Sequence, residues 1–181
     1  IEKITGIRPE FEEIDLTDGE VTRDFFARHS DIRAVIHFAA LKAVGESVNK
    51  PLEYYFNNLN SLMNVLTCMR EFKVPNLVFS SSCTVYGQAD VLPVTEKTPR
   101  HEAESPYGNT KVMSEDIIRD LMRVEPDMKA LALRYFNPIG AHPTAFIGEL
   151  PNGVPNNLIP YLTQTAIGIR EQLSVFGDDY N

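Results

Sequence analysis

The sequence predicts an α/β fold built on a doubly wound parallel sheet. Apolar segments of strand length, at residues 34–40, 77–82 and 129–136, alternate with segments whose apolar residues recur at helical spacing. The segment 34–40 is apolar apart from one histidine, which is typical of a strand buried on both faces of a parallel sheet. Polar or small residues end each of these segments, and in such sheets ligands bind beyond the carboxyl ends of the strands.

The first part of the chain is predicted to hold a further strand and a helix. Residues 11–16 are expected to form a short strand that ends in an acidic residue, and Thr17 or Asp18 can cap the helix that follows. A loop is expected over residues 42–46. Both ends look cut, because residues 1–6 resemble the tail of a helix and no element closes the chain. We therefore expect an internal piece of a longer protein.

The later elements alternate in the same way. Apolar residues at helical spacing predict a helix over residues 57–72. Ser105 is a good N-cap and Pro106 suits the first helical position, so a helix is expected from there to about residue 124. The segment 137–157 holds four prolines and three glycines, which predicts a long irregular loop of a kind that is usually functional. The last predicted elements are a helix and a short strand, at residues 158–168 and 173–176.

Composition and charge narrow the classes of partner. The chain has 181 residues and a net charge of −8, which argues against binding to nucleic acid or to an anionic membrane surface. Its longest apolar run is far too short to span a bilayer, and we expect no secretory signal. Cys68 and Cys83 are isolated and lack metal-ligand spacing, which suits a reducing cytoplasm and predicts no metal site.

The residues most suggestive of chemistry are Ser82, Tyr107 and Lys111. Tyr107 and Lys111 stand at i and i+4 on a predicted helix, so the phenol and the ammonium share one face. A nearby ammonium favours the phenolate and should lower the pKa of Tyr107, which improves the side chain as a proton acceptor. The hydroxyl of Ser82, at a strand end, could relay or orient the proton. Such a pair alone is weak evidence, and its position after a serine-terminated strand strengthens the interpretation.

Each candidate also has a structural explanation. The serines at 80–82 could be a polar strand exit, Asp15 an ordinary helix cap and Asn157 a turn residue. His37 is better explained as a hydrogen-bonded core histidine than as a ligand, because no second histidine or carboxylate lies at ligand spacing. Lys42 alone would be a solvent-facing loop residue. The functional interpretation depends on joint position, because the strand ends meet along one edge of one sheet.

Five motifs carry a resemblance to a known family. They are VIHFAALKAVGES (35–47), SSSCTVYG (80–87), YGNTK (107–111), RYFNPIGAHP (134–143) and PNNLIPY (155–161). Over essentially its whole length the chain resembles the extended short-chain dehydrogenases/reductases, and among them the UDP-glucose (UDP-galactose) 4-epimerases. The resemblance implies a partial Rossmann-type NAD-binding domain over residues 1–137. It also implies the start of a UDP-sugar-binding region over residues 138–181.

The resemblance implies roles for individual residues. Ser82, Tyr107 and Lys111 would be the catalytic set. The residues implied at the NAD site are Asp15, Leu16, Phe38, Ala39, Ala40, Lys42, Asn57, Ser80, Tyr107, Lys111 and Tyr135. The residues implied at the UDP-sugar site are Lys42, Ser82, Tyr107, Phe136, Asn137, Asn157, Leu158, Val175 and Phe176.

The chain departs from this family in one respect, because it has no Gly-rich loop of the kind that holds the pyrophosphate at a helix N-terminus. We therefore expect the first βα unit of the fold and most of the C-terminal substrate domain to be missing. This piece alone is expected to be inactive. Apolar residues on the helices that carry Asn57 and Tyr107 predict a homodimer formed through those helices, as the resemblance also implies.

The implied activity is the interconversion of UDP-glucose and UDP-galactose by transient NAD-dependent oxidation at C4 of the sugar. Two alternatives stay open. Nucleotide-sugar 4,6-dehydratases and other nucleotide-sugar short-chain dehydrogenases resemble this chain, but the dehydratases carry an Asp-Glu pair where it has Cys83 and Thr84. A non-catalytic dinucleotide-binding relative is disfavoured by the intact set of Ser82, Tyr107 and Lys111.

Overall fold

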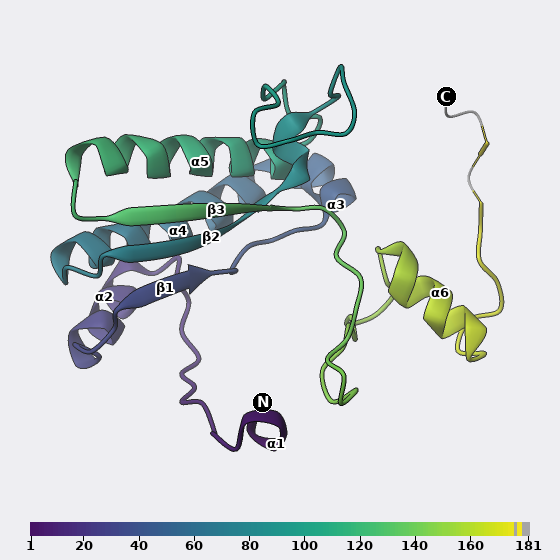
Figure 1. Cartoon of the computed structure of the whole chain (residues 1–181), viewed down its shortest axis with the longest axis horizontal. Helices are drawn as coiled ribbons and strands as arrows, with labels where there is room; N and C mark the ends of the chain where they lie inside the picture. Colours follow the sequence, from purple (N-terminus) through teal and green to yellow (C-terminus); the bar gives the residue numbers. More distant parts are fainter. Residues whose placement is uncertain (176, 179–181) are drawn as a thin grey trace. The chain divides into compact units, whose positions relative to one another are not determined.

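The structure of the protein is a computed structural model that describes residues 1–175 and 177–178. Its contacts divide the chain into two compact units. The sheet unit is Glu12–Phe136, and the flanking unit joins Ile1–Phe11 to the described residues from Asn137 onward. The sheet unit contains the strands and most of the helices (Figure 1).

The elements follow one another in the alternating order expected of an α/β chain. They are α1 (Glu2–Thr5), α2 (Gly19–Arg28), β1 (Ala34–His37), α3 (Val44–Asn49), α4 (Pro51–Glu71), β2 (Asn76–Ser82), the 3-10 helix η1 (Cys83–Tyr86), α5 (Pro106–Val124), β3 (Lys129–Tyr135) and α6 (Leu158–Ala166).

The three strands form one parallel sheet with β2 in the middle. Parallel pairing brings the carboxyl ends of the strands to one edge, where His37 lies beside Phe79 and Ser82 lies beside Tyr135. The predicted parallel sheet is therefore confirmed. This register also brings together two residues that the sequence places more than fifty positions apart, since Ser82 and Tyr135 belong to different strands.

Helices α4 and α5 pack on one face of this sheet and enclose the core (Figure 1). Successive side chains of a strand alternate between faces, so Leu77 and Phe79 of β2 both point toward these helices. Helical spacing places Leu62, Leu66 and Met69 of α4 on the side that meets them. Burying each such side chain contributes about 1.5–3 kcal/mol, which makes this face the main source of the unit's stability.

The opposite face of the sheet is largely uncovered. Ile36 of β1 and Leu131 of β3 flank Val78 in the register, and they are 63% and 56% exposed. The expectation that residues 34–40 are buried on both faces is therefore wrong for the part of the chain that the structure describes. The physical reason is that β1 is an edge strand, while α4 and α5 cover only the face that carries Leu77.

Two predicted strands do not form. Residues 11–16 pair with no backbone among the described residues, and the N–H of Asp18 instead donates to the carbonyl of Asp15 in a turn, at 3.0 Å. Residues 173–175 likewise form no strand, and Phe176 of that prediction lies outside the described residues. A strand requires a neighbour that satisfies its backbone groups, and a hydrophobic pattern alone does not provide one.

The predicted helices are confirmed, apart from two differences. Helix α4 begins earlier than predicted, at Pro51, and α3 lies partly within the predicted loop. Gly45 in the first turn of α3 lowers the helix propensity, which hides this short helix from prediction by pattern. Asp18, one of two predicted caps, is the N-cap of α2, and Ser105 is the N-cap of α5.

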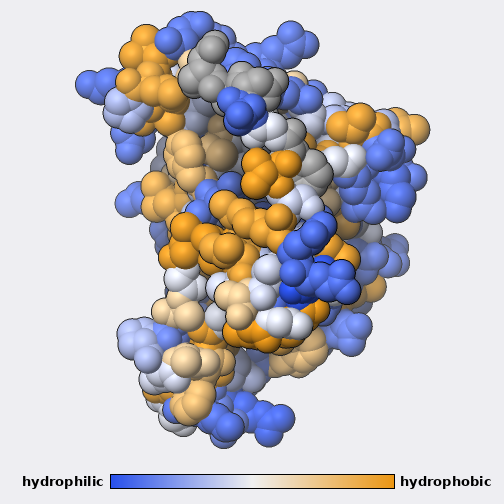
Figure 2. Space-filling model, turned by 90° about the vertical axis from the view of Figure 1, so that its right-hand side faces the viewer, coloured by the Kyte–Doolittle hydropathy of each residue, from blue (hydrophilic) through white to orange (hydrophobic). Residues whose placement is uncertain are grey.

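The flanking unit contains α6 and the loop over residues 137–157, which is irregular as predicted. Many of its apolar side chains are exposed, among them Ile139, Phe146, Leu150, Val154, Ile167, Ile169 and Val175. Figure 2 shows hydrophobic residues (orange) at the surface among hydrophilic ones (blue). Among the described residues, no helix combines the length and the hydrophobicity that crossing a bilayer requires.

Candidate active site

Ser82 is the last residue of the central strand and the N-cap of η1. Its hydroxyl oxygen accepts a hydrogen bond from the N–H of Thr84 at 3.2 Å, which fixes the side-chain rotamer at the carboxyl edge of the sheet. The side chain is buried. The last serine of the run therefore ends the strand and also caps a helix, and its hydroxyl is near enough to Tyr107 to lower the pKa of that phenol.

Ser105 and Gly108 hold the start of α5 close to η1. The hydroxyl of Ser105 accepts from the N–H of Gly108 at 3.1 Å, which satisfies one of the free donors at the helix start. A Cβ at Gly108 would lie 3.3 Å from the Cβ atoms of both Ala103 and Thr84, so a larger residue would push the helix away. Tyr107 is thereby held beside the end of β2.

Lys111 is a buried cation, only 4% exposed. Its Nζ donates to the carbonyl of Ser80 at 2.7 Å and lies 4.9 Å from the ring centre of Phe79 and 5.8 Å from that of Tyr107. Burial lowers the pKa of Lys111 to about 8, because the charged form loses its hydration. The amine is thus anchored to the strand end and points across the face of the phenol ring.

The pKa of Tyr107 differs from the expectation. Burial raises it, the hydroxyl of Ser82 lowers it, and the net shift is upward. The predicted lowering by Lys111 is therefore wrong for this structure, because the ammonium is directed at the carbonyl of Ser80 rather than at the phenol oxygen. Ser82 is the neighbour that favours the phenolate here, which gives this hydroxyl a more direct part than the sequence suggested.

Asn58 is a residue at this edge that the sequence analysis missed. Its side chain accepts from the N–H of Leu41 at 2.8 Å and donates to the carbonyl of Leu41 at 3.0 Å and to the hydroxyl of Thr110 at 3.2 Å. It therefore ties the segment after β1 to α4 and α5. Its neighbour Asn57, the predicted cofactor residue, donates to the Asn58 side chain at 3.0 Å. A polar residue buried in an apolar helix stripe is the signal that would have identified Asn58.

Small and aromatic residues follow β1 and end β3. Phe38 is exposed and lies 6.2 Å, centre to centre, from the ring of Tyr135. Ala39 and Ala40 come next, and neither presents a side chain large enough to block a ligand from the backbone. Lys42 is exposed, which agrees with its interpretation as a solvent-facing loop residue. Phe38 and Tyr135 thus form an accessible aromatic wall at the same edge as Ser82.

Asp15 is not a helix cap. Its carboxylate accepts from the N–H and the hydroxyl of Thr17, both at 2.8 Å, and these bonds lower the pKa of Asp15. The amide of Asn64 on α4 donates to the carbonyls of Leu16 and Thr17, at 2.9 and 3.0 Å. The segment that carries both predicted cofactor residues is therefore held against α4, with the Asp15 side chain exposed.

The predicted substrate residues are divided between the two units. Phe136 is exposed in the sheet unit, with its ring 6.5 Å from that of Tyr86. In the flanking unit Asn157 donates to Glu149 at 2.9 Å, and Asn137, Leu158 and Val175 are exposed. Phe176 lies outside the described residues. Within the described chain, no group of three His, Cys, Asp or Glu side chains could hold a metal ion.

Comparison with known proteins gives a consistent family. The model of the NAD dependent epimerase/dehydratase family matches residues 2–180. The UDP-glucose 4-epimerase of Mus musculus is 53% identical over 180 residues, which are 99% of this chain and 52% of that protein. That of Erwinia amylovora is 52% identical, with 99% of this chain and 53% of that protein covered. The chain spans about half the length of these curated relatives.

Solved structures show the same likeness. The UDP-glucose 4-epimerase from Bifidobacterium longum in complex with NAD+ and UDP superposes with a TM-score of 0.94 at 46% identity, over 99% of this chain and 53% of that one. The enzyme from Stenotrophomonas maltophila with bound NAD and formylated UDP-arabinopyranose gives a TM-score of 0.92 at 46% identity, with the same coverage. The chain therefore belongs to the NAD dependent epimerase/dehydratase family, and it resembles the UDP-glucose 4-epimerases over its whole length.

Proposed function

We propose that the protein interconverts UDP-glucose and UDP-galactose through transient oxidation at C4 of the sugar. The observation that carries the proposal is the grouping of Ser82, Tyr107 and Lys111 at the carboxyl edge of the sheet, in a chain about half identical to UDP-glucose 4-epimerases along its entire length. An ionisable phenol beside a buried amine and a helix-capping serine is suited to removing a proton from an alcohol.

The residues at this edge suit NAD as the cofactor. The small side chains of Ala39 and Ala40 allow close approach to the backbone, Phe38 and Tyr135 offer an apolar surface, and Lys111 offers a donor to ribose hydroxyls. When bound, NAD accepts a hydride from the sugar and returns it. Relatives of known structure contain NAD together with UDP or a UDP-sugar.

In the proposed mechanism the protein's own groups manage the proton. Tyr107 takes the proton of the C4 hydroxyl, either directly or through the hydroxyl of Ser82. Lys111 supplies positive charge near the phenol ring and keeps the end of β2 in place through the carbonyl of Ser80. Burial raises the pKa of Tyr107, and the hydroxyl of Ser82 acts against that shift in favour of the phenolate.

The choice of epimerase over 4,6-dehydratase rests on Cys83 and Thr84. Elimination requires an acid and a base directly after Ser82, and neither side chain offers a carboxyl group. Thr84 donates its backbone N–H to Ser82 instead, within η1. A dehydratase would eliminate water and convert UDP-glucose into a UDP-4-keto-6-deoxy sugar, whereas the proposed reaction yields only UDP-galactose.

The direct test removes the phenol oxygen. In the full-length protein, Tyr107→Phe should still fold and bind NAD but lose turnover of UDP-galactose by about 10⁴-fold, and Ser82→Ala should lose nearer about 10²-fold, the span typical of general-base catalysis. Coupled detection of UDP-glucose measures both rates. A Tyr107→Phe enzyme with near-normal turnover, or a wild type that forms a 4-keto-6-deoxy sugar, would reject the proposal.

We further propose that the full-length protein is a homodimer that pairs α4 and α5 with their copies. The support is a set of exposed apolar side chains on these two neighbouring helices, namely Leu52, Phe56, Met63, Met113 and Val124. A two-fold contact would bury them in a four-helix arrangement. Sedimentation at micromolar concentration should give a dimer that Phe56→Glu dissociates, whereas Val91→Glu, at an exposed loop position, should leave it intact.

The proposal also assigns a role to each region of the chain and a compartment to the protein. Residues 138–181, with Asn157 and Leu158, are assigned to the start of the UDP-sugar-binding region, and residues 1–137 to the cofactor domain. The cytoplasm is the proposed compartment, because Cys68 and Cys83 are both free thiols. Oxidation of the purified protein with diamide should leave Cys68 unreacted, because it is buried and its pKa is raised by that burial.

A further inference from the structure

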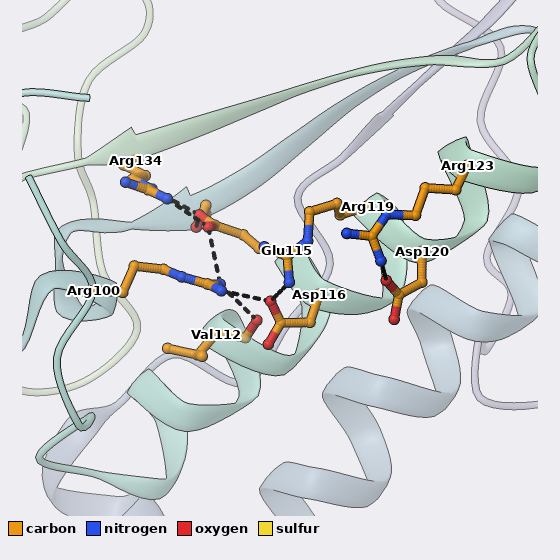
Figure 3. Close-up of polar contacts among 9 residues, drawn as sticks. Arg100, Val112, Glu115, Asp116, Arg119, Asp120, Arg123 and Arg134 are labelled. Atoms are coloured by element: carbon orange, nitrogen blue, oxygen red, sulfur yellow. Dashed lines mark hydrogen bonds and ion pairs between the residues drawn. The ribbon is translucent and has the colours of Figure 1, made fainter. Parts of the chain in front are cut away.

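Glu115 joins four separate segments of the sheet unit through one carboxylate. It lies on α5, accepts from the hydroxyl of Ser81 on β2 at 2.6 Å and accepts twice from the guanidinium of Arg134 on β3, at 2.9 and 2.7 Å. Arg100, from the loop before α5, lies 3.6 Å away. Figure 3 shows the carboxylate of Glu115 between the two arginines.

Glu115 and its two hydrogen-bonding partners each lie next to a residue of the candidate active site. Ser81 precedes Ser82, Arg134 precedes Tyr135, and Glu115 is one helical turn beyond Lys111. The guanidinium of Arg134 also lies 4.8 Å from the ring centre of Tyr86, at the end of η1. The carboxylate therefore fixes the two strand ends and α5 at the same level along the sheet.

The burial of this pair is informative. The side chains of Glu115 and Arg134 are 9% and 23% exposed, whereas the Asp120–Arg123 pair on the same helix is 65% and 70% exposed. Burial alone would raise the pKa of Glu115, but its bonds to Arg134 and Ser81 lower it, so the carboxylate stays ionised. Apolar side chains of similar volume often hold a helix on a sheet as well as a buried ion pair does. What the pair adds is a fixed direction, since a bidentate contact sets distance and angle together.

We propose that Glu115 is a positioning residue for the reaction proposed above, holding the ends of β2 and β3 in register with α5 so that Ser82 reaches Tyr107. This inference rests on the proposed function for its role in catalysis. The geometric part of the inference can be tested apart from catalysis, because the hydroxyl of Ser82 lowers the pKa of Tyr107. Loosening the Glu115 contacts should let Ser82 move away and raise that pKa further.

The first experiment compares Glu115→Gln with Asp120→Asn in the full-length protein. Both changes remove one carboxylate charge from α5, and only the first touches the strand ends. Glu115→Gln should lower kcat by about 10²-fold, the loss typical of a misplacement near 1 Å, with little change in KM. Asp120→Asn should match the wild type. Equal kcat values for the two variants would overturn the proposal.

A second variant separates positioning from stability, since Glu115→Gln leaves a buried guanidinium without its partner. Glu115→Leu combined with Arg134→Met removes both charges and should bring the melting temperature back toward that of the wild type. If Glu115 positions the site, kcat stays low in this double variant. Recovery of kcat together with the melting temperature would show a purely structural role and overturn the inference.

An optical titration decides the inference without turnover. The tyrosinate absorbance of each protein, less that of its Tyr107→Phe counterpart, reports the pKa of Tyr107 alone. This pKa should be higher in Glu115→Gln and in the double variant than in the wild type and in Asp120→Asn. An unchanged pKa would overturn the proposal. A wild type without epimerase activity would reject the proposed function, and the titration would still test the geometry.

Discussion

The two units of the chain differ in where their candidate residues find support. In the sheet unit, Ser82, Tyr107 and Lys111 are held by hydrogen bonds and packing from other elements of that unit. In the flanking unit, Asn157 makes one side-chain bond to Glu149, and Leu158 is exposed. The residues proposed for proton transfer are therefore held in place within the sheet unit, whereas the residues proposed for substrate contact have little support within the flanking unit.

This difference separates the two kinds of effect that substitutions should have. Changes in the sheet unit should alter stability or the rate of the chemical step, because its side chains are packed around a common edge. Changes in the flanking unit should alter substrate affinity.

The largest contrast is expected in stability. Leu62 is 0% exposed in the core and Leu150 is 88% exposed in the flanking unit. Leu62→Ala should lower the free energy of unfolding of this 181-residue chain by about 2–5 kcal/mol, whereas Leu150→Ala should change it by less than about 0.5 kcal/mol. Urea unfolding measures both. Equal losses would show that Leu150 is as well packed as the core and would remove the contrast.

The next effect concerns acid stability of the sheet unit. His37 is buried against Phe79, and burial, with a smaller effect of Lys111, lowers its pKa from 6.5 to about 4. The unfolded chain binds the proton more tightly, so the stability that His37 contributes above pH 6.5 is lost as the pH falls toward 4. The loss is about 3 kcal/mol, and His37→Gln should flatten this part of the stability profile. An unchanged slope would contradict the assigned burial.

The smallest effect is expected in substrate affinity. Asn157→Ala in the full-length protein should raise KM for the UDP-sugar by about tenfold, the value of one lost hydrogen bond, and leave kcat nearly unchanged. Ser82→Ala should show the opposite split. A kcat loss for Asn157→Ala without a change in KM would place this residue in the chemistry rather than in binding.

The sequence predicted the parts of this architecture that local chemistry determines. Ser105 and Asp18 are caps because their side chains reach nearby N–H groups, and the order of strands and helices follows from hydrophobic spacing. The parallel sheet follows from that order. The prediction of a strand at residues 11–16 was wrong, because a strand depends on a distant partner that no local pattern reveals.

The sequence predicts which residues could form the candidate site, but it does not predict the contacts of Lys111 or the pKa of Tyr107. Helical spacing correctly puts Tyr107 and Lys111 on neighbouring turns of α5, yet it does not show that Nζ would bond to the carbonyl of Ser80. Nor does it reveal the burial that raises the pKa of Tyr107. Glu115 was missed for a similar reason, because its partners Ser81 and Arg134 lie on strands far away in the sequence.

The central claim is that Tyr107 is the proton acceptor and that Lys111 assists it. The most direct measurement is the pH dependence of kcat/KM for the full-length wild type and Lys111→Met. The profile reports the apparent pKa values of the groups whose protonation state controls the reaction in the free enzyme. We expect kcat/KM of the wild type to rise through a lower apparent pKa than that of Lys111→Met. The variant loses the bond that anchors the end of β2, and with it the position of Ser82, whose hydroxyl lowers the pKa of Tyr107 against the effect of burial. Profiles that rise through the same apparent pKa would contradict the account.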